Sequence, residues 1–454
     1  MHETQRGPSM LSKSAVLNLN RECYCFPIER NSIDYSIRQS VPDVVALGGS
    51  RENLFAGTGI LIDSTDVDAM LGVIDAIEAL ANSILYRAGK EQTTPELMRW
   101  QDVTGDGMVM GYDFHIDANG PELIEVNTNA GGAFIANELL AAANQIYPAC
   151  CGFSPLAMNR HLLPDLLLRE WLSAGRQGVP RTAAIVDDGP TDQFLYPDMQ
   201  IAKSYFESIG IQTVIFDIAD LVFENGILQC HGSPIDIVYN RSTDFFLENE
   251  SSAALRNAAL ERAAVVSPNP LHHALYADKG NFIEYTDASM LKQYGLSETQ
   301  QGYLKAYVPT TRLLTTDTAT ELYQRRKQLF FKPVDGYGSK AVYRGDKMTS
   351  RVWRQILKET EQGRAYIAQT NVPPSLRAVE AVGERTQLKY DVRIFTAGGV
   401  PLIATARIYQ GQTTNFRTAG GGFAPVYSWS DVNARTSFNE CCLLYTSPSP
   451  RDRG

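Results

Sequence analysis

Two carboxylates and one amide lie in a predicted β-hairpin where their side chains share a face. Residues 108–116 and 122–126 alternate apolar and polar side chains, and residues 117–120 (Asp-Ala-Asn-Gly) have the composition of a tight hairpin turn. Glu125 and Asn127 are two residues apart and point the same way, while Asp113 lies on the opposing arm. Such oxygen donors suit Mg²⁺, which shares its coordination with phosphate oxygens. The metal site expected here is Asp113, Glu125 and Asn127; the alternative is an exposed polar face of the hairpin.

A lysine at the end of an apolar strand precedes a glycine-containing loop. Lys332 follows two phenylalanines, and residues 335–340 read Asp-Gly-Tyr-Gly-Ser-Lys. Gly336 and Gly338 let backbone N–H groups close over an anion, and Lys332 supplies a positive charge for phosphate oxygens. The spacing is not that of a Walker A loop. Phosphate binding is one interpretation, and a tight hairpin with solvated lysines is the other.

Three arginines accompany a second glycine-rich loop near the end of the chain. Asp391 and Arg393 alternate with apolar residues on one predicted strand, Arg407 ends the next strand, and Arg417 precedes Gly420-Gly-Gly422. Arginines at strand ends beside such a loop can clamp phosphate or carboxylate oxygens. A solvated strand face is the alternative.

Other reactive side chains form weaker patterns. His115 alternates with Asp113 on the same predicted strand, whereas His272 and His273 are adjacent and are expected to point apart as a surface pair. The chain contains no Gly-x-Ser-x-Gly turn, and its cysteines do not have the spacing of a disulfide framework or a zinc finger. No side chain stands out as a protein nucleophile.

The composition is that of a globular protein of two or three domains. The 454 residues carry 41 Lys and Arg against 51 Asp and Glu, a net charge of −10, which opposes broad nucleic-acid binding. No apolar run reaches the roughly 18 residues of a spanning helix, and the N-terminus lacks the pattern of a secretory signal. We therefore expect a cytoplasmic protein that binds neither membrane nor nucleic acid. The oligomeric state cannot be read from the sequence.

The elements that must position these residues are mixed α and β. Residues 1–60 look irregular, and residues 67–86, 133–143 and 156–174 have helical periodicity. Residues 182–186, 213–216, 235–239 and 264–267 are β-rich and alternate with helical stretches, which predicts a parallel sheet. Further strands are expected at 329–333, 341–343, 366–369, 388–396 and 401–408.

Taken together, residues 105–430 resemble the ATP-grasp superfamily in its circularly permuted branch. Asp113, Glu125 and Asn127 have the spacing of the metal triad in the synthetase domain of glutathionylspermidine synthase, and here this hairpin precedes the lysine strand instead of following it. Residues 182–246 resemble the pre-ATP-grasp α/β module of the permuted proteins. Asp278-Lys279 resembles the pair that opens the helical part of the fold, and Gln369 stands in a segment like the hinge strand that packs against adenine.

The resemblance implies an α/β (α+β) fold of the permuted ATP-grasp type with an embedded parallel-sheet module. The expected units are 1–104, an N-terminal helical or irregular segment; 105–180, the metal-binding part; 181–275, the α/β module; and 276–441, the nucleotide-binding part. Residues 442–454 resemble an in-frame translation of a sequencing adaptor and are set aside as an artefact.

The resemblance also implies a reaction and a role for each motif. ATP would phosphorylate a carboxylate, and an amine would displace the phosphate to form an amide, with small molecules or peptides as substrates. An ATP-binding protein without ligase activity and a small-molecule kinase are the alternatives. Mg²⁺ would be held by the hairpin triad. ATP would be bound by Lys279, Lys332, Gly336, Gly338, Ser339, Lys340 and Gln369, and the transferred phosphoryl group and tetrahedral intermediate would be stabilised by Arg393, Arg407, Asn415 and Arg417.

Two positions depart from the family pattern. The hinge segment has Gln369 where many relatives have an acidic residue, and the second departure lies in the hairpin. The glutathionylspermidine enzymes have an arginine two residues before the metal aspartate, and this chain has Gly111 there. We expect the role of that arginine to pass to Arg241, Arg407 or Arg417.

Overall fold

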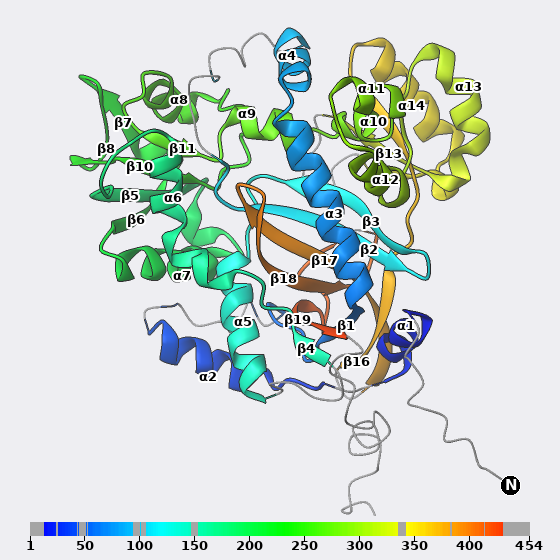
Figure 1. The fold of residues 1–454 in the computed structure, drawn as a ribbon, viewed down its shortest axis with the longest axis horizontal. Helices are drawn as coiled ribbons and strands as arrows, with labels where there is room; N and C mark the ends of the chain where they lie inside the picture. The colour runs from blue at the N-terminus through cyan, green and yellow to red at the C-terminus, as the bar shows by residue number, and fades with distance from the viewer. Residues whose placement is uncertain are drawn as a thin grey trace, which may run out of the picture.

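The computed structural model describes residues 13–23, 26–42, 44, 51, 53–93, 100, 106–146, 153–334, 342–381, 384–412 and 414–429. The glycine loop at 335–341 and the adaptor-like tail at 442–454 lie outside these residues. Figure 1 shows a large sheet with the green α/β module on one side and a smaller sheet with its helices on the other.

The large sheet joins strands from both ends of the chain. Its order is β1-β19-β18-β17-β2-β3, with β16 paired to β17 and β4 paired to β19. Because β2 pairs with β17, the predicted metal hairpin lies directly beside the predicted arginine strand. The strands are β1 (Ile60–Asp63), β2 (Met110–Asp117), β3 (Gly120–Asn127), β4 (Phe153–Pro155), β16 (Ser375–Ala381), β17 (Glu384–Ala397), β18 (Val400–Tyr409) and β19 (Gly422–Trp429).

The hairpin prediction is confirmed, with Asp113 paired to Glu125 and a bulge immediately after Asp113. This sheet contains strands from the predicted units 1–104, 105–180 and 276–441, so those units are joined through backbone pairing. The division into domains stays a prediction.

Helix α3 (Ser64–Ala81) packs against the large sheet and crosses it in Figure 1. Asp63 caps it by accepting a hydrogen bond from the backbone N–H of Thr65 at 2.9 Å. The expected helix at 67–86 is in part wrong, because α3 ends at Ala81 and α4 (Ile84–Thr93) begins after a break. Within the described part of the chain, no single helix has the length and hydropathy of a membrane span; α3 and the start of α4 meet that test only as a pair bent by 71°.

The parallel module predicted in the middle of the chain is confirmed. Its strand order is β11-β10-β5-β6 and every pairing is parallel. Between β6 and β10 lies an unpredicted antiparallel sheet, β7-β8-β9, whose first turn contains Asn225-Gly226, a strong hairpin signal. The elements are β5 (Thr182–Asp187), α7 (Tyr196–Ser208), β6 (Gln212–Asp217), β7 (Leu221–Glu224), β8 (Ile227–Cys230), β9 (Ser233–Pro234), β10 (Ile237–Asn240), α8 (Ala253–Leu260) and β11 (Val265–Ser267).

The small sheet has the order β12-β15-β13-β14 and is antiparallel. On β13 the side chains of Leu329 and Phe331 belong to a core that includes Trp353 of α14. Strand alternation therefore turns Phe330 and Lys332 to the opposite face. The elements are β12 (Thr311–Leu313), α13 (Thr316–Arg325), β13 (Leu329–Pro333), β14 (Tyr343–Arg344), α14 (Ser350–Glu361) and β15 (Tyr366–Thr370).

Two other sequence-based expectations are wrong. Residues 1–60 include regular elements: α1 (Lys13–Glu22), α2 (Arg30–Ser40) and the first residue of β1. The single helix expected at 156–174 is a 3₁₀ turn containing Pro164 followed by α6 (Leu166–Ser173), because proline lacks the N–H that a helix interior needs. The remaining helices are α5 (Ala133–Ile146), α9 (Pro270–His272), the π-helical turn His273–Ala277, α10 (Asn281–Tyr285), α11 (Ala288–Gln293) and α12 (Glu298–Tyr307).

Candidate active site

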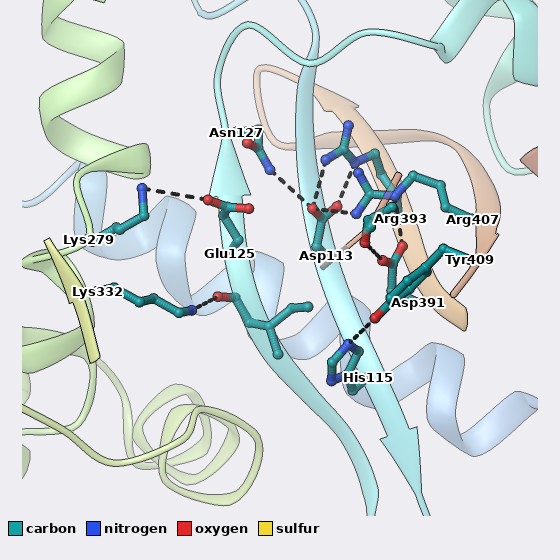
Figure 2. Close-up of polar contacts among 12 residues, drawn as sticks. Asp113, His115, Glu125, Asn127, Lys279, Lys332, Asp391, Arg393, Arg407 and Tyr409 are labelled. Atoms are coloured by element: carbon teal, nitrogen blue, oxygen red, sulfur yellow. Dashed lines mark hydrogen bonds and ion pairs between the residues drawn. The ribbon is translucent and has the colours of Figure 1, made fainter. Parts of the chain in front are cut away.

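A cavity of about 380 Å³ lies where the large sheet, the small sheet and the loops of the α/β module meet. Strands β2 and β3 supply one wall, and Lys332 and Gln369 face it from the small sheet. Phe245 and His273 enter from the module side. Figure 2 shows that the two lysines and the two arginines approach the hairpin from opposite sides.

Asp113 is the centre of an arginine cluster. Arg393 stands opposite it on β17 and binds it with two hydrogen bonds, Nε to Oδ1 at 2.5 Å and Nη2 to Oδ2 at 2.7 Å. Arg407 Nη2 donates to the same Oδ2 at 2.7 Å, and Asn127 Nδ2 donates to it at 3.1 Å. Burial alone would raise the pKa of Asp113, but the charges of Arg393 and Arg407 outweigh it and hold that pKa below its ordinary value.

A second carboxylate fixes the other side of Arg407. Asp391 is buried and accepts a hydrogen bond from Arg407 Nε at 2.7 Å, and it also accepts one from the hydroxyl of Thr414. Burial lowers the pKa of Arg407, but Asp113 and Asp391 more than compensate and raise it. Arg407 therefore stays charged, and through Thr414 the cluster is connected to the glycine-rich loop after β18.

Lys332 and Gln369 form the opposite wall. Lys332 Nζ donates to the side-chain oxygen of Gln369 at 2.8 Å and to the backbone oxygen of Ile124 at 3.2 Å. Gln369 in turn donates to Thr311 at 3.2 Å. Burial lowers the pKa of Lys332 to about 8, against the opposing effect of the Glu125 charge. These bonds aim an incompletely charged ammonium group across the cavity toward β3.

Glu125 and Asn127 are the oxygen donors best placed for a cation. The Glu125 side chain is 41% exposed, and its carboxylate lies 3.6 Å from Lys279 Nζ. Asn127 uses its Nδ2 for Asp113, which turns its donor group to that residue and leaves Oδ1 as the amide atom suited to a metal. Both side chains line the cavity. This donor set fits Mg²⁺ in its usual form, bound by few protein oxygens together with water and phosphate.

Asp113 fits the metal role less well than expected. Its carboxylate already accepts four hydrogen bonds, three of them from arginines. The expectation that two neighbouring carboxylates need a cation does not hold here, because arginines neutralise Asp113 and Lys279 faces Glu125. In residues 13–429, apart from the gaps given above, no group of three or more His, Cys, Asp or Glu side chains could hold a metal ion.

Several expected site residues are not brought to the cavity. Arg417 is exposed, and neither it nor Asn415 is part of the cavity wall. Asn415 Oδ1 instead accepts hydrogen bonds from the backbone N–H of Arg417 at 3.0 Å and from Thr418 at 3.1 Å, so it shapes the loop. Arg241 is buried beside Asp198 at 3.6 Å. Four expected nucleotide ligands, Gly336, Gly338, Ser339 and Lys340, lie outside the described residues.

Two residues at the site carried little or no signal in the sequence. His115 lines the cavity and is held between Val372 O, 2.8 Å from Nδ1, and Tyr409 OH, 3.5 Å from Nε2. Burial lowers the pKa of His115. The two-residue spacing from Asp113 indicated its side of the strand, but Tyr409 comes from a strand far along the chain. His273, expected on the surface, instead stacks on Phe245 with ring centroids 4.2 Å apart.

The fold is similar to solved structures at low sequence identity. No protein-family model and no curated protein matches the sequence. A glutathione synthetase-like effector from Globodera pallida superposes with a TM-score of 0.58 and 12% identity, covering 92% of this chain and 98% of that one. The chain has a glutathione synthetase-like fold. A putative gamma-glutamylcysteine synthetase from Methylobacillus flagellatus overlaps less closely, with a TM-score of 0.42 and 10% identity over 78% of this chain and 86% of that one. The assignment rests on the first structure, and the permuted chain order stays a prediction.

Proposed function

We propose that the protein is an ATP-dependent ligase that joins a carboxylate to an amine and releases ADP and phosphate. The observation that carries this proposal is the convergence, in one cavity, of two lysines, two arginines and the Glu125–Asn127 oxygen pair. Such a site supplies charge neutralisation and positioning for phosphoryl transfer, and its described lining residues include no Ser or Cys.

Each group has a distinct proposed role. Lys279 and Lys332 bind phosphate oxygens of ATP, and Gln369, which is hydrogen-bonded to Lys332, also contributes to binding the nucleotide. Glu125 and Asn127 hold Mg²⁺ together with phosphate oxygens. The ion, when bound, neutralises charge on the phosphates and fixes their geometry. Arg393 and Arg407 face the transferred group, and Asp113 and Asp391 hold these two guanidiniums in place.

The proposed chemistry proceeds in two balanced steps. A substrate carboxylate oxygen forms a bond to the γ-phosphorus as the bond from that phosphorus to ADP breaks. The amine nitrogen then forms a bond to the acyl carbon, the acyl–phosphate bond breaks to release phosphate, and the nitrogen loses a proton. Arginine N–H groups are suited to stabilise the negative charge that develops in both steps.

The first experiment measures thermal melting of the full chain with Mg·ATP, with Mg·AMP-PNP and with nucleotide plus EDTA. A ligand at about 100 times its dissociation constant adds about 2.7 kcal/mol, or a few degrees for a chain of this size. A Mg²⁺-dependent shift supports the nucleotide site and leads to a screen of amino acids, peptides and polyamines for ADP release. Absence of a shift in a well-folded sample contradicts the proposal.

Product analysis then distinguishes the reaction classes. ADP with phosphate and an amide supports the ligase, whereas ADP with a stable phosphorylated compound indicates a kinase. Nucleotide binding without any product in the screen contradicts the ligase assignment and favours a binding protein. Lys332→Ala is the control variant for the nucleotide measurements, because it removes one positive charge from the cavity and leaves the hydrogen bonds of Asp113 untouched.

A further inference from the structure

Gly111 lies on β2 two residues before Asp113, so both positions face the same side of the strand. On the neighbouring strand, Phe395 pairs with Gly111 and Arg393 pairs with Asp113. The side chain of Arg393 therefore starts beside Asp113 and has room to extend over residue 111 only if that residue carries no side chain.

The space above Gly111 is occupied by Arg393. A Cβ atom placed on Gly111 would come within 2.9 Å of Arg393 Nε and 3.0 Å of Arg393 Cδ. It would also lie 3.1 Å from the Cβ of Ala130. A methyl group here would crowd both neighbours, and the one with a flexible side chain able to move is the arginine. Backbone strain plays no part, because Gly111 does not have a positive φ.

The displaced atoms are those that bind Asp113. Arg393 Nε is both the atom closest to the added Cβ and the donor to Asp113 Oδ1, and Cδ sets the direction of the guanidinium. Moving them is expected to weaken or break the two-bond contact with Asp113, whose other described donors are Arg407 and Asn127.

We propose that Gly111 is a positioning residue that seats Arg393 against Asp113 and thereby sets the geometry of the two-arginine cluster. Of the three arginines expected to replace the one missing from position 111, Arg407 does reach Asp113, whereas Arg241 lies beside Asp198 and Arg417 is exposed. The guanidinium beside Gly111 comes from Arg393 on the adjacent strand. The catalytic consequence rests on the ligase function proposed above, whereas the steric relation between Gly111 and Arg393 does not.

The steric relation is tested without any activity assay. Gly111→Ala is expected to lower the melting temperature by several degrees, and its effect is expected to be smaller in an Arg393→Ala background, where only the contact with Ala130 remains. Gly302→Ala is the matched control, since Gly302 lies in α12 with nothing within 4 Å of an added Cβ. A crystal structure of Gly111→Ala decides the matter even if Arg393→Ala does not fold. Arg393 still bound to Asp113 by both nitrogens would overturn the proposal, as would equal destabilisation by Gly111→Ala in both backgrounds.

The catalytic consequence has its own measurement. In folded Gly111→Ala we expect kcat for ADP release to fall by about 10²-fold, as misplacement of a positioned group by about 1 Å can do, while the dissociation constant for Mg·AMP-PNP changes by less than about twofold. A purely structural role would lower the folded fraction and leave kcat per folded molecule unchanged, which contradicts the proposal. If the unsubstituted protein releases no ADP with any substrate, the proposed function fails, and the melting and crystallographic results still decide the role of Gly111.

Discussion

Nucleotide binding should weaken as pH rises through the pKa of Lys332. Only the protonated ammonium group attracts phosphate oxygens, and burial lowers the pKa of this lysine to about 8. At pH 7 about 90% of the molecules carry the proton, and at pH 9 about 10% do. If only the charged form is competent to bind, the apparent dissociation constant is divided by that fraction and rises about tenfold between pH 7 and pH 9.

The sign of this dependence follows from the direction of the shift. A lysine of ordinary pKa, 10.5, would stay charged over the whole interval and would produce no change. Calorimetric titration of Mg·AMP-PNP at several pH values between 7 and 9 measures the effect. Lys332→Ala is the control, because it should bind several-fold more weakly at pH 7 and lose the pH dependence that the lysine causes. Titration of the nucleotide itself affects both proteins equally and cancels in the comparison. Parallel pH profiles for the two proteins would refute the reasoning.

Three further substitutions probe the other groups of the site. Glu125→Ala should abolish Mg²⁺-dependent ATP turnover without unfolding the protein, because the side chain is 41% exposed; unchanged turnover would remove Glu125 from the metal site. Asp113→Ala leaves two guanidiniums without a shared partner and should lower the free energy of unfolding in urea by about 3–5 kcal/mol. The folded-state pKa of Asp113 is depressed, so the stability difference between the two proteins is fully present above the pKa that Asp113 has in the unfolded chain. The difference should shrink as pH falls through the folded-state pKa of Asp113. A stability difference that does not change with pH in that range would contradict the assignment. Asp198→Ala removes the acceptor of three backbone N–H groups at the start of α5 and the partner of Arg241, and a loss of about 2–4 kcal/mol is expected; a loss below about 1 kcal/mol would mean that other groups replace it.

The elements that position the hairpin and the lysine could be predicted because their signals are local. The turn at residues 117–120 and the alternation on both sides of it specify the hairpin, and the structure has Asp113 opposite Glu125. The apolar residues around Lys332 likewise predict a strand, and β13 spans Leu329–Pro333. Strand alternation alone then determines which face of each strand carries the polar side chains.

The partners of Asp113 could not be predicted, because they depend on which strands are neighbours. Arg393 is 280 residues away in the chain and reaches Asp113 only because β17 pairs with β2. A sequence shows two nearby carboxylates and suggests a cation between them. The sheet instead delivers two arginines to one of the carboxylates, and that changes the role we assign to Asp113 from metal ligand to holder of guanidiniums.

The charge pattern of the cavity explains how such a site can be buried before any ligand arrives. Arg393 and Arg407 are compensated by Asp113 and Asp391, so the cluster is close to neutral and both carboxylates accept hydrogen bonds from arginines. Among the described residues, the hydrogen-bond partners of Lys332 are the neutral Gln369 and a backbone oxygen, and burial lowers its pKa to about 8. A phosphate bound beside this lysine would stabilise its charged, protonated form. The two sides of the cavity therefore differ electrostatically. On the arginine side, protein carboxylates already balance the positive charge. On the lysine side, the phosphates of a nucleotide would supply the balancing negative charge.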